Sequence, residues 1–233
     1  MNNLKPDILY EDNHIIIVNK FTSDLVQKDQ TGDLSLDDKL KKYLKEKYDK
    51  PGNVFLGIPH RLDRPVSGAV IYAKTSKALT RLTAMFKNRE VEKIYYAIVK
   101  SIPPKDEDKL IHHLVRNTKQ NKSYAFNSFR KNSKVAILNY KVIAGDGKYY
   151  LLEINLMTGR HHQIRCQLAK IECPIKGDKK YGYPKANEDK GICLHAGKVE
   201  FLHPVSGEHI KIMAPAPQNS SWLRFNQIIE FRD

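Results

Sequence analysis

Short apolar segments that end at turn residues recur along this chain and narrow the choice of fold. The segment VEKIYYAIVK alternates between two faces, one of which carries Tyr95, and this alternation is typical of a β-strand. VAILNYKVI and YYLLEINLM predict two more strands, because the glycines between them, Gly145 and Gly147, allow a tight hairpin turn. The pattern therefore predicts a sheet with these two strands well inside it.

Both ends of the chain continue this pattern. ILYEDNHIIIVNK predicts two strands around an Asp-Asn turn, and the second strand ends in the polar pair Asn19 and Lys20, a position from which a strand can deliver polar groups to a site. Towards the C-terminus, LHAGKVEFLHPVSGEHIKIMAP predicts a hairpin that turns between His203 and Gly207.

A few segments have helical spacing instead. SLDDKLKKYLKEKY predicts an amphipathic helix, and a second helix is expected after Ser76, which can cap its N-terminus. The expected apolar stripes are Leu36, Leu40, Tyr43 and Leu44 in the first helix and Leu79, Leu82, Thr83 and Phe86 in the second. SSWLRFNQII predicts a short capped helix, with Trp222 and Phe225 packing on the core. We interpret these stripes as core packing.

A charged loop, Ile58 to Arg64, lies between the segments VFLGI and AVIYAK, which we expect to be strands. It places Asp63 between the guanidinium groups of Arg61 and Arg64, and an adjacent cation favours the ionised carboxylate. Loops between rigid strands commonly carry catalytic residues. Adjacent Arg and Asp residues are, however, more often an exposed ion pair that contributes little. These residues alone leave both interpretations open.

A second polar cluster, TGRHHQIRCQLAKIE, lies where a predicted strand meets a predicted helix. Arg160 and Arg165 flank the start of this helix, and a helix N-terminus beside a guanidinium can bind a phosphate or a carboxylate such as that of Asp63. His161 and His162 are adjacent, so their side chains point in different directions along a helix, and no zinc-binding spacing is present. We therefore expect no metal site here.

The charge of the chain indicates a polyanionic partner. Its 233 residues include 40 Lys and Arg against 26 Asp and Glu, a formal net charge of +14. No apolar run approaches the roughly 20 residues that span a bilayer, which favours nucleic acid over a membrane. The three cysteines, Cys166, Cys173 and Cys193, form no C-x-x-C pair and are odd in number. Reduced thiols and a cytoplasmic location are therefore expected.

Residues 103–134 combine basic and aromatic side chains. The basic residues are Lys105, Lys109, Arg116, Lys119, Lys122, Arg130, Lys131 and Lys134, and the aromatic ones are Tyr124, Phe126 and Phe129. Basic groups neutralise phosphates and aromatic rings stack on unpaired bases, so this region can be an RNA-facing edge. A solvated β-hairpin explains the same composition equally well.

Four segments in this order resemble the RluA-type pseudouridine synthases: ILYEDNHIIIVNK, HRLDRPVSGAVIYAK, VEKIYYAIV and LMTGRHHQIRCQLA. The resemblance extends over nearly the whole chain. It implies an α+β fold with a mixed, largely antiparallel central sheet, split by a catalytic cleft and flanked by helices. It further implies one catalytic domain over residues 1–233, without an N-terminal RNA-binding domain of the S4 type. The implied substrate is a uridine in ribosomal or transfer RNA, with no cofactor and no metal.

The resemblance also assigns roles to residues. Asp63 is expected to be catalytic, Tyr95 to lie against the target base, and Arg165 to pair with Asp63. Arg61 matches the arginine thought to enter the RNA stack when the uridine is flipped. The substrate-binding residues expected are Asn19, Lys20, His60, Arg61, Arg64, Arg160 and Gln163. We also expect a monomer without an obligate protein partner, because no sustained heptad or spare apolar stripe is present.

Some positions depart from the family pattern. Phe21 stands where proline is usual, Val66 where threonine is usual, and Cys166 and Gln167 where valine and histidine are common. None removes a catalytic side chain, so they bear on substrate preference more than on activity. They also keep open a noncatalytic RNA-binding or RNA-chaperone protein on the same fold.

A third, disfavoured interpretation is a metal-dependent nuclease. It would use Asp63 together with His161, His162 or His195.

Overall fold

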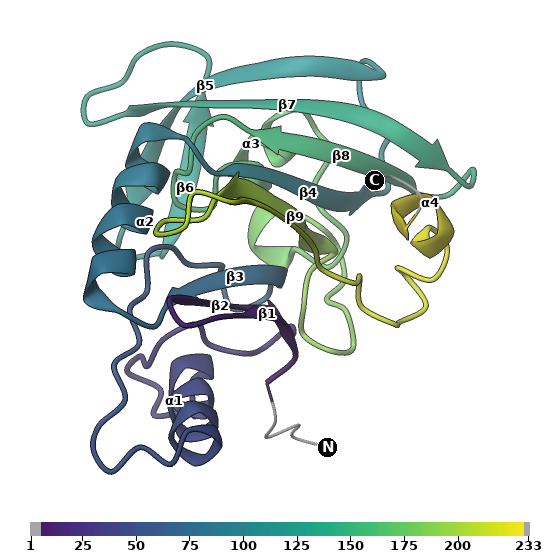
Figure 1. Ribbon diagram of the computed structural model, residues 1–233. Coiled ribbons are helices and arrows are strands. Elements are labelled where there is room, and N and C mark those ends of the chain that lie inside the picture. The colour runs from purple at the N-terminus through teal and green to yellow at the C-terminus, as the bar shows by residue number, and fades with distance from the viewer. Residues whose placement is uncertain (1–5, 231–233) are drawn as a thin grey trace. The chain divides into compact units, whose positions relative to one another are not determined.

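Residues 6–230 are described by the computed structural model, and they form ten β-strands, four α-helices and one 3-10 helix (Figure 1). The fold is α+β, as predicted. The chain divides into two units, of which the first contains residues up to Glu92 together with Ala196–Pro215. The second contains Lys93–His195 and the residues from Ala216 onward. The catalytic cleft and the single functional domain stay predictions.

The first unit is built on antiparallel strands and two helices. Its elements are β1 (Ile8–Glu11), β2 (Ile15–Lys20), α1 (Leu36–Lys47), β3 (Ser67–Ala73), α2 (Ser76–Asn88), β9 (Leu194–Leu202, from Ala196 on) and β10 (His209–Met213). The strand order is β1-β2-β3-β9, and β10 pairs with β9. The pairs β1–β2, β2–β3 and β9–β10 are antiparallel, so both predicted hairpins are confirmed.

The core of the first unit follows from alternation along its strands. Ile15 and Ile17 of β2 and Ile71 of β3 point to one face, where they pack with Ala78 and Leu82 of α2. The predicted leucine stripe of α1 is buried as well, with Leu36, Leu40 and Leu44 all inaccessible to solvent or nearly so. The helical periodicity read from the sequence therefore identified real core faces.

The second unit is an antiparallel sheet with the order β4-β8-β7-β5-β6. Its elements are β4 (Glu92–Val99), β5 (Glu107–Asn117), β6 (Lys122–Phe126), β7 (Lys134–Gly145), β8 (Tyr150–Leu156), α3 (Gln163–Lys170), the 3-10 helix η1 (Lys179–Tyr181) and α4 (Asn226–Glu230). The β7–β8 hairpin lies inside this sheet, as predicted. On one face of β5 and β7, Leu114 and Ala136 pack with Cys166 of α3 and with Tyr181.

Four local predictions were wrong. The segment VFLGI is no strand, because only Gly57 bridges to Ala73, Phe55 is exposed, and Pro59 has no N–H to continue a ladder. The cap of α2 is Thr75, whose hydroxyl accepts a hydrogen bond from the backbone N–H of Ala78 at 3.2 Å.

Ser76, which was predicted to be that cap, is the first residue inside α2. Thr83 is exposed and lies outside the buried stripe of this helix. Near the C-terminus, Trp222 and Phe225 are buried as predicted, but they precede α4, which begins at Asn226.

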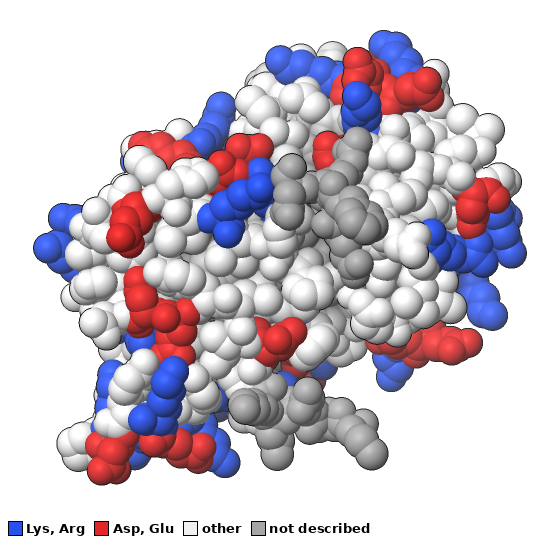
Figure 2. Space-filling model, turned by 45° about the vertical axis from the view of Figure 1, so that its right-hand side comes forward, with Lys and Arg blue, Asp and Glu red and all other residues white. Residues whose placement is uncertain are grey.

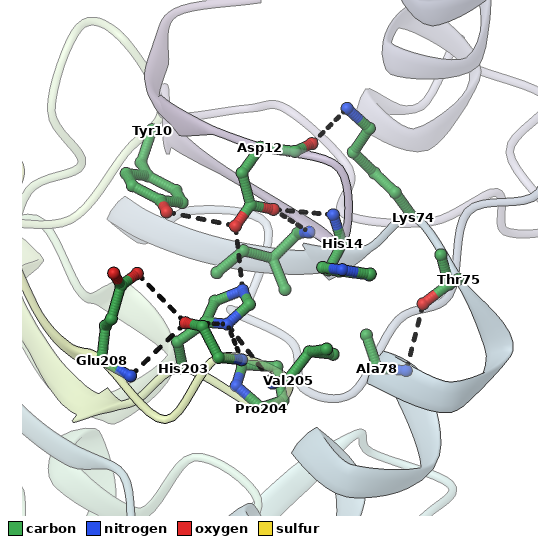
Figure 3. A network of polar contacts seen from close by, with 12 residues as sticks. Tyr10, Asp12, His14, Lys74, Thr75, Ala78, His203, Pro204, Val205 and Glu208 are labelled. Atoms are coloured by element: carbon green, nitrogen blue, oxygen red, sulfur yellow. Dashed lines mark hydrogen bonds and ion pairs between the residues drawn. The ribbon is translucent and has the colours of Figure 1, made fainter.

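A polar network joins the β1–β2 turn to the β9–β10 turn (Figure 3). The Asp12 carboxylate accepts the backbone N–H groups of His14 and Ile15, both at 2.7 Å, and lies 2.9 Å from Nε2 of His203. On the other side of that imidazole ring, Nδ1 accepts the backbone N–H of Ser206 at 2.9 Å. The two turns, nearly 200 residues apart in sequence, are therefore fixed through one imidazole.

Glu11 anchors α1 to the strands. Burial alone would raise the pKa of Glu11, but hydrogen bonds to its carboxylate outweigh this effect and lower the pKa to about 2. Its donors are the ammonium groups of Lys47 (2.7 Å) and Lys74 (2.9 Å) and the hydroxyl groups of Tyr48 (2.7 Å) and Tyr43 (2.9 Å).

Among residues 6–230, no helix has both the length and the apolar composition to cross a membrane.

We expect Glu11→Gln to lower the free energy of unfolding at pH 7 by about 2–3 kcal/mol, because the folded state loses a carboxylate that it stabilises. The pKa is lower in the folded state, so this contribution is complete above the unfolded pKa of 4.5 and disappears as the pH falls towards about 2. Urea unfolding across this pH range measures the difference. Glu46→Gln, which removes an exposed ion pair on the same helix, is the control. Equal effects of both substitutions at pH 7 would contradict the prediction.

Candidate functional site

Asp63 lies on a loop whose flanks are buried. Leu62 and Val66 are almost inaccessible to solvent, whereas Asp63 itself is partly exposed. The backbone N–H of Val66 donates to the carbonyl of Asp63 at 3.0 Å and closes the loop. Two residues later Gly68 has a φ of 117°, and a Cβ there would overlap the backbone of Ala196. The loop is therefore fixed at both ends.

The side chain of Lys20, at the end of β2, holds this loop in place. Its side chain is completely buried, and its ammonium group donates to the carbonyls of Val66 (2.6 Å), Arg64 (3.0 Å) and Phe21 (3.0 Å). Burial lowers the pKa of Lys20 to about 7, against the opposing effects of the Asp24 and Asp63 carboxylates. Lys20 thus contacts the loop backbone, and its effect on a substrate would pass through the loop.

The other predicted binding residues of the first unit also have protein partners. Arg64 binds Asp33 at 2.6 Å and the carbonyl of Ser23 at 3.2 Å, so its guanidinium restrains the preceding segment. His60 accepts the backbone N–H of Ile71 at 2.9 Å, and its ring stacks on Phe86. Asn19 donates to the carbonyl of Pro215 at 3.1 Å, and Arg61 is exposed.

Arg165 is held by a buried carboxylate in the second unit. Its Nε donates to Oδ2 of Asp178 at 2.7 Å and its Nη2 donates to Oδ1 at 2.9 Å, which is a two-bond pairing with planar geometry. The guanidinium also lies over the ring of Tyr181, 5.1 Å from its centre. Both members of the ion pair are almost inaccessible to solvent. Asp178 holds one edge of the guanidinium and Tyr181 covers one face, so the orientation of Arg165 is fixed.

The turn before α3 is ordered by Gln163. Its side-chain oxygen accepts the hydroxyl of Thr158 at 2.7 Å and the backbone N–H of Arg160 at 3.0 Å, and its amide donates to the carbonyl of Ile137. Gln163 is buried, so the substrate contact predicted for it would also be indirect. Arg160 is exposed and donates from Nε to the carbonyl of Val135 at 3.0 Å.

His161 and His162 stack on each other, with ring centres 3.8 Å apart. The Nδ1 atom of His162 lies 2.9 Å from the hydroxyl of Tyr181, and Nδ1 of His161 lies 2.9 Å from the hydroxyl of Ser123. His195 is buried, edge-on to Trp222. No group of three or more His, Cys, Asp or Glu in the described part of the chain has a metal-binding arrangement.

Tyr95 is buried in β4, opposite Ile154 of β8. Two residues earlier on the same strand, Lys93 is also largely buried, and burial lowers the pKa of its ammonium group. The predicted catalytic residues are thus divided between the units: Asp63 belongs to the first, and Tyr95 and Arg165 belong to the second. Their meeting at one site stays a prediction.

Sequence reasoning missed Asp178. In the segment GDKKYG, the acid Asp178 is buried and Tyr181 supports Arg165. One signal in the sequence could have identified this acid. It stands in a short segment bounded by glycines that also contains a tyrosine, shortly after a helix that carries an arginine. A buried acid requires a cation, and Arg165 is 13 residues away.

Comparison with known proteins gives one family. The sequence profile of the family described as RNA pseudouridylate synthase matches residues 14–170. A Bacillus subtilis protein named an uncharacterized RNA pseudouridine synthase, YlyB, is 32% identical over 93% of this chain and 71% of its own length. A Rickettsia prowazekii protein named ribosomal large subunit pseudouridine synthase C is 32% identical over 90% of this chain and 68% of its own length.

Solved structures share the fold. Human RNA pseudouridylate synthase domain containing 4 has a TM-score of 0.76 at 23% identity, over 91% of this chain and 89% of its own. Human RNA pseudouridylate synthase domain containing 1 has a TM-score of 0.73 at 23% identity, over 99% and 97% of the two chains. At this identity the likeness concerns the fold.

We expect Lys20→Met to loosen the loop that carries Asp63, because the carbonyl of Val66 would be left buried without its donor, at a cost of about 1–3 kcal/mol. Limited digestion with trypsin should then cut after Arg61 faster than in the wild type, and urea unfolding should show the loss of stability. Lys42→Met, on the exposed side of α1, is the matched control. An unchanged cleavage rate in Lys20→Met would show that the loop does not depend on this contact.

We expect Asp178→Asn to lower the free energy of unfolding by about 3 kcal/mol, because it leaves the Arg165 charge buried without its partner. The double variant Arg165→Met/Asp178→Asn should lose clearly less than the sum of the two single losses. Urea unfolding of the four proteins measures this coupling. Strictly additive losses would mean that the pairing contributes nothing to stability.

Proposed function

The chain belongs to the RNA pseudouridylate synthase family, and we propose that it converts specific uridines in structured RNA to pseudouridine with Asp63 as its essential group. The observation that carries the choice of Asp63 is its position: a partly exposed carboxylate on a loop that the buried Lys20 fixes from below. A catalytic group has to be held in a defined place before the substrate binds.

The reaction is an isomerisation, so no atom is gained or lost overall. The bond between ribose C1′ and uracil N1 breaks, the base turns, and C5 forms the new bond to C1′. C5 loses a proton and N1 ends with one. Asp63 can serve as a nucleophile at C1′, as a nucleophile at C6, or as the base that removes the C2′ proton, and each role requires the ionised carboxylate.

Two residues of the second unit would complete the site. Arg165 would stabilise the ionised form of Asp63, since a fixed cation favours a nearby anion. Its binding to Asp178 supports this role, because it fixes the direction of the guanidinium group. Tyr95 would lie against the flipped uracil, and flipping is needed because the glycosidic bond is out of reach inside a stacked helix.

The RNA class is proposed from the relatives and the charge. A relative from Rickettsia is named for the large ribosomal subunit, so we propose ribosomal RNA as the first substrate to test and transfer RNA as the second. With a net charge of +14, phosphate contacts should supply much of the affinity. Exposed Arg61 and Arg160 are the predicted site residues best placed to reach RNA.

We expect Asp63→Asn to reduce pseudouridine formation by about 10²–10⁴-fold, since positioned proton transfer by one group commonly contributes that much. Unmodified ribosomal and transfer RNA are incubated with each protein, and pseudouridines are mapped chemically. The control is Asp49→Asn, an exposed acid of the same unit, which should leave the rate unchanged.

Two outcomes would overturn parts of this proposal. Activity of Asp63→Asn equal to that of the wild type would exclude Asp63 as the essential group. Equal pseudouridine maps in RNA from cells with and without the gene would instead favour a noncatalytic RNA-binding protein, in which Phe21 and Val66 mark a changed site.

A further inference from the structure

One face of β5 and β7 in the second unit carries apolar side chains that are exposed. The register pairs Ile111 with Ile137 and His113 with Val135, so these four residues point the same way. Ile111 is 53% exposed and Val135 is 41% exposed, because α3 packs against the opposite face of these strands. Exposed apolar patches of this kind commonly mark a binding surface.

Phe129 extends this patch and is 71% exposed. It lies on the β6–β7 loop, where its ring is edge-on to His113 at 6.0 Å between centres. The loop is closed just beyond it, because the backbone N–H of Ser133 donates to the carbonyl of Arg130 at 2.9 Å and the hydroxyl of Ser133 accepts the N–H of Arg130. The ring is therefore presented to solvent by a loop that its own hydrogen bonds hold in place.

The sequence around Phe129 and Val135 is basic. No Asp or Glu occurs between residues 109 and 145, and none occurs between 154 and 171. Arg130 and Lys131 follow Phe129 directly, and Arg160 binds the carbonyl of Val135. By contrast, charges of both signs gather over α1, at the lower left of Figure 2. The patch thus combines an exposed aromatic ring with cations that lack nearby acidic neighbours in sequence.

We propose that this surface, Phe129 with Ile111, Val135, Arg130 and Lys131, binds an unpaired segment of RNA beside the target, with Phe129 stacked on a base. Every base has a flat π-face, so an exposed ring can stack on it without sequence preference, while the cations neutralise the adjacent phosphates. The inference rests on the proposed function for the identity of the RNA. Of the two interpretations of residues 103–134, the proposal favours an RNA-facing edge.

The test measures RNA binding without turnover. Fluorescence anisotropy is recorded with a labelled short oligouridine and with a duplex of equal length. Phe129→Ala should weaken binding of the single strand about tenfold, since stacking on one ring commonly contributes that much, and should leave duplex binding unchanged. Phe129→Tyr should restore it. Ile102→Ala is the matched control, because Ile102 is also 71% exposed in the same unit but lies next to an acidic segment.

Substitution of the basic residues tests the proposed RNA binding independently. The double variant Arg130→Gln/Lys131→Gln should reduce the slope of log affinity against log salt by about 0.7 for each cation, and Lys148→Gln on the β7–β8 turn should not. Unchanged single-strand affinity in Phe129→Ala would overturn the inference and point to a protein partner for this face. Wild-type turnover in Asp63→Asn would overturn the proposed role of Asp63 but leave this inference standing, so the two proposals can fail separately.

Discussion

The buried ammonium group of Lys20 is the contact on which the candidate site depends. It lies at the end of a fully buried strand and gathers three backbone carbonyls, two of which belong to the loop that carries Asp63. A carbonyl has no net charge, so each hydrogen bond offsets only part of the cost of burying the cation, and the pKa of Lys20 falls to about 7. The loop thereby has a fixed shape. The accompanying cost is a buried ammonium group without a charged partner among these three contacts, which few positions in a protein tolerate.

The second unit also buries a cation, but with a different kind of partner. Arg165 is also a buried cation, but its partner is the carboxylate of Asp178, which neutralises its charge and binds along one edge of the guanidinium. Lysine donates in several directions and suits a ring of carbonyls, whereas the planar arginine suits a two-oxygen partner. In each unit a buried cation thus takes part in ordering a predicted site residue: Lys20 fixes the loop of Asp63, whereas Arg165 is itself the cation and is fixed by Asp178.

Patterns within a segment were predictable, and partners across the sequence were not. The stripe of α1 and the hairpins at Gly145–Gly147 and His203–Gly207 follow from local spacing, and the structure confirms them. The strand expected at VFLGI failed because pairing depends on a neighbour that apolar character does not reveal. Lys20 is predicted to bind substrate because it ends a strand in a polar pair. Only the fold shows that loop carbonyls surround its ammonium group. The family resemblance gave the order of the motifs, but the role of Asp178 required its position in space.

The first unit is discontinuous in sequence, and this affects when it can form. Its core joins Ile15 and Ile17 to Val199, Phe201 and Ile210, and its turns meet through Asp12 and His203. During synthesis, β1, β2 and β3 emerge early, with an apolar face and an unpaired strand edge, and are completed only after residues 93–195 of the second unit have followed. Such delayed long-range pairing is slow and exposes the nascent chain to aggregation. We therefore expect the sheet formed by β4 to β8 to become protected on the ribosome before the first unit, which is complete only when β9 and β10 have emerged.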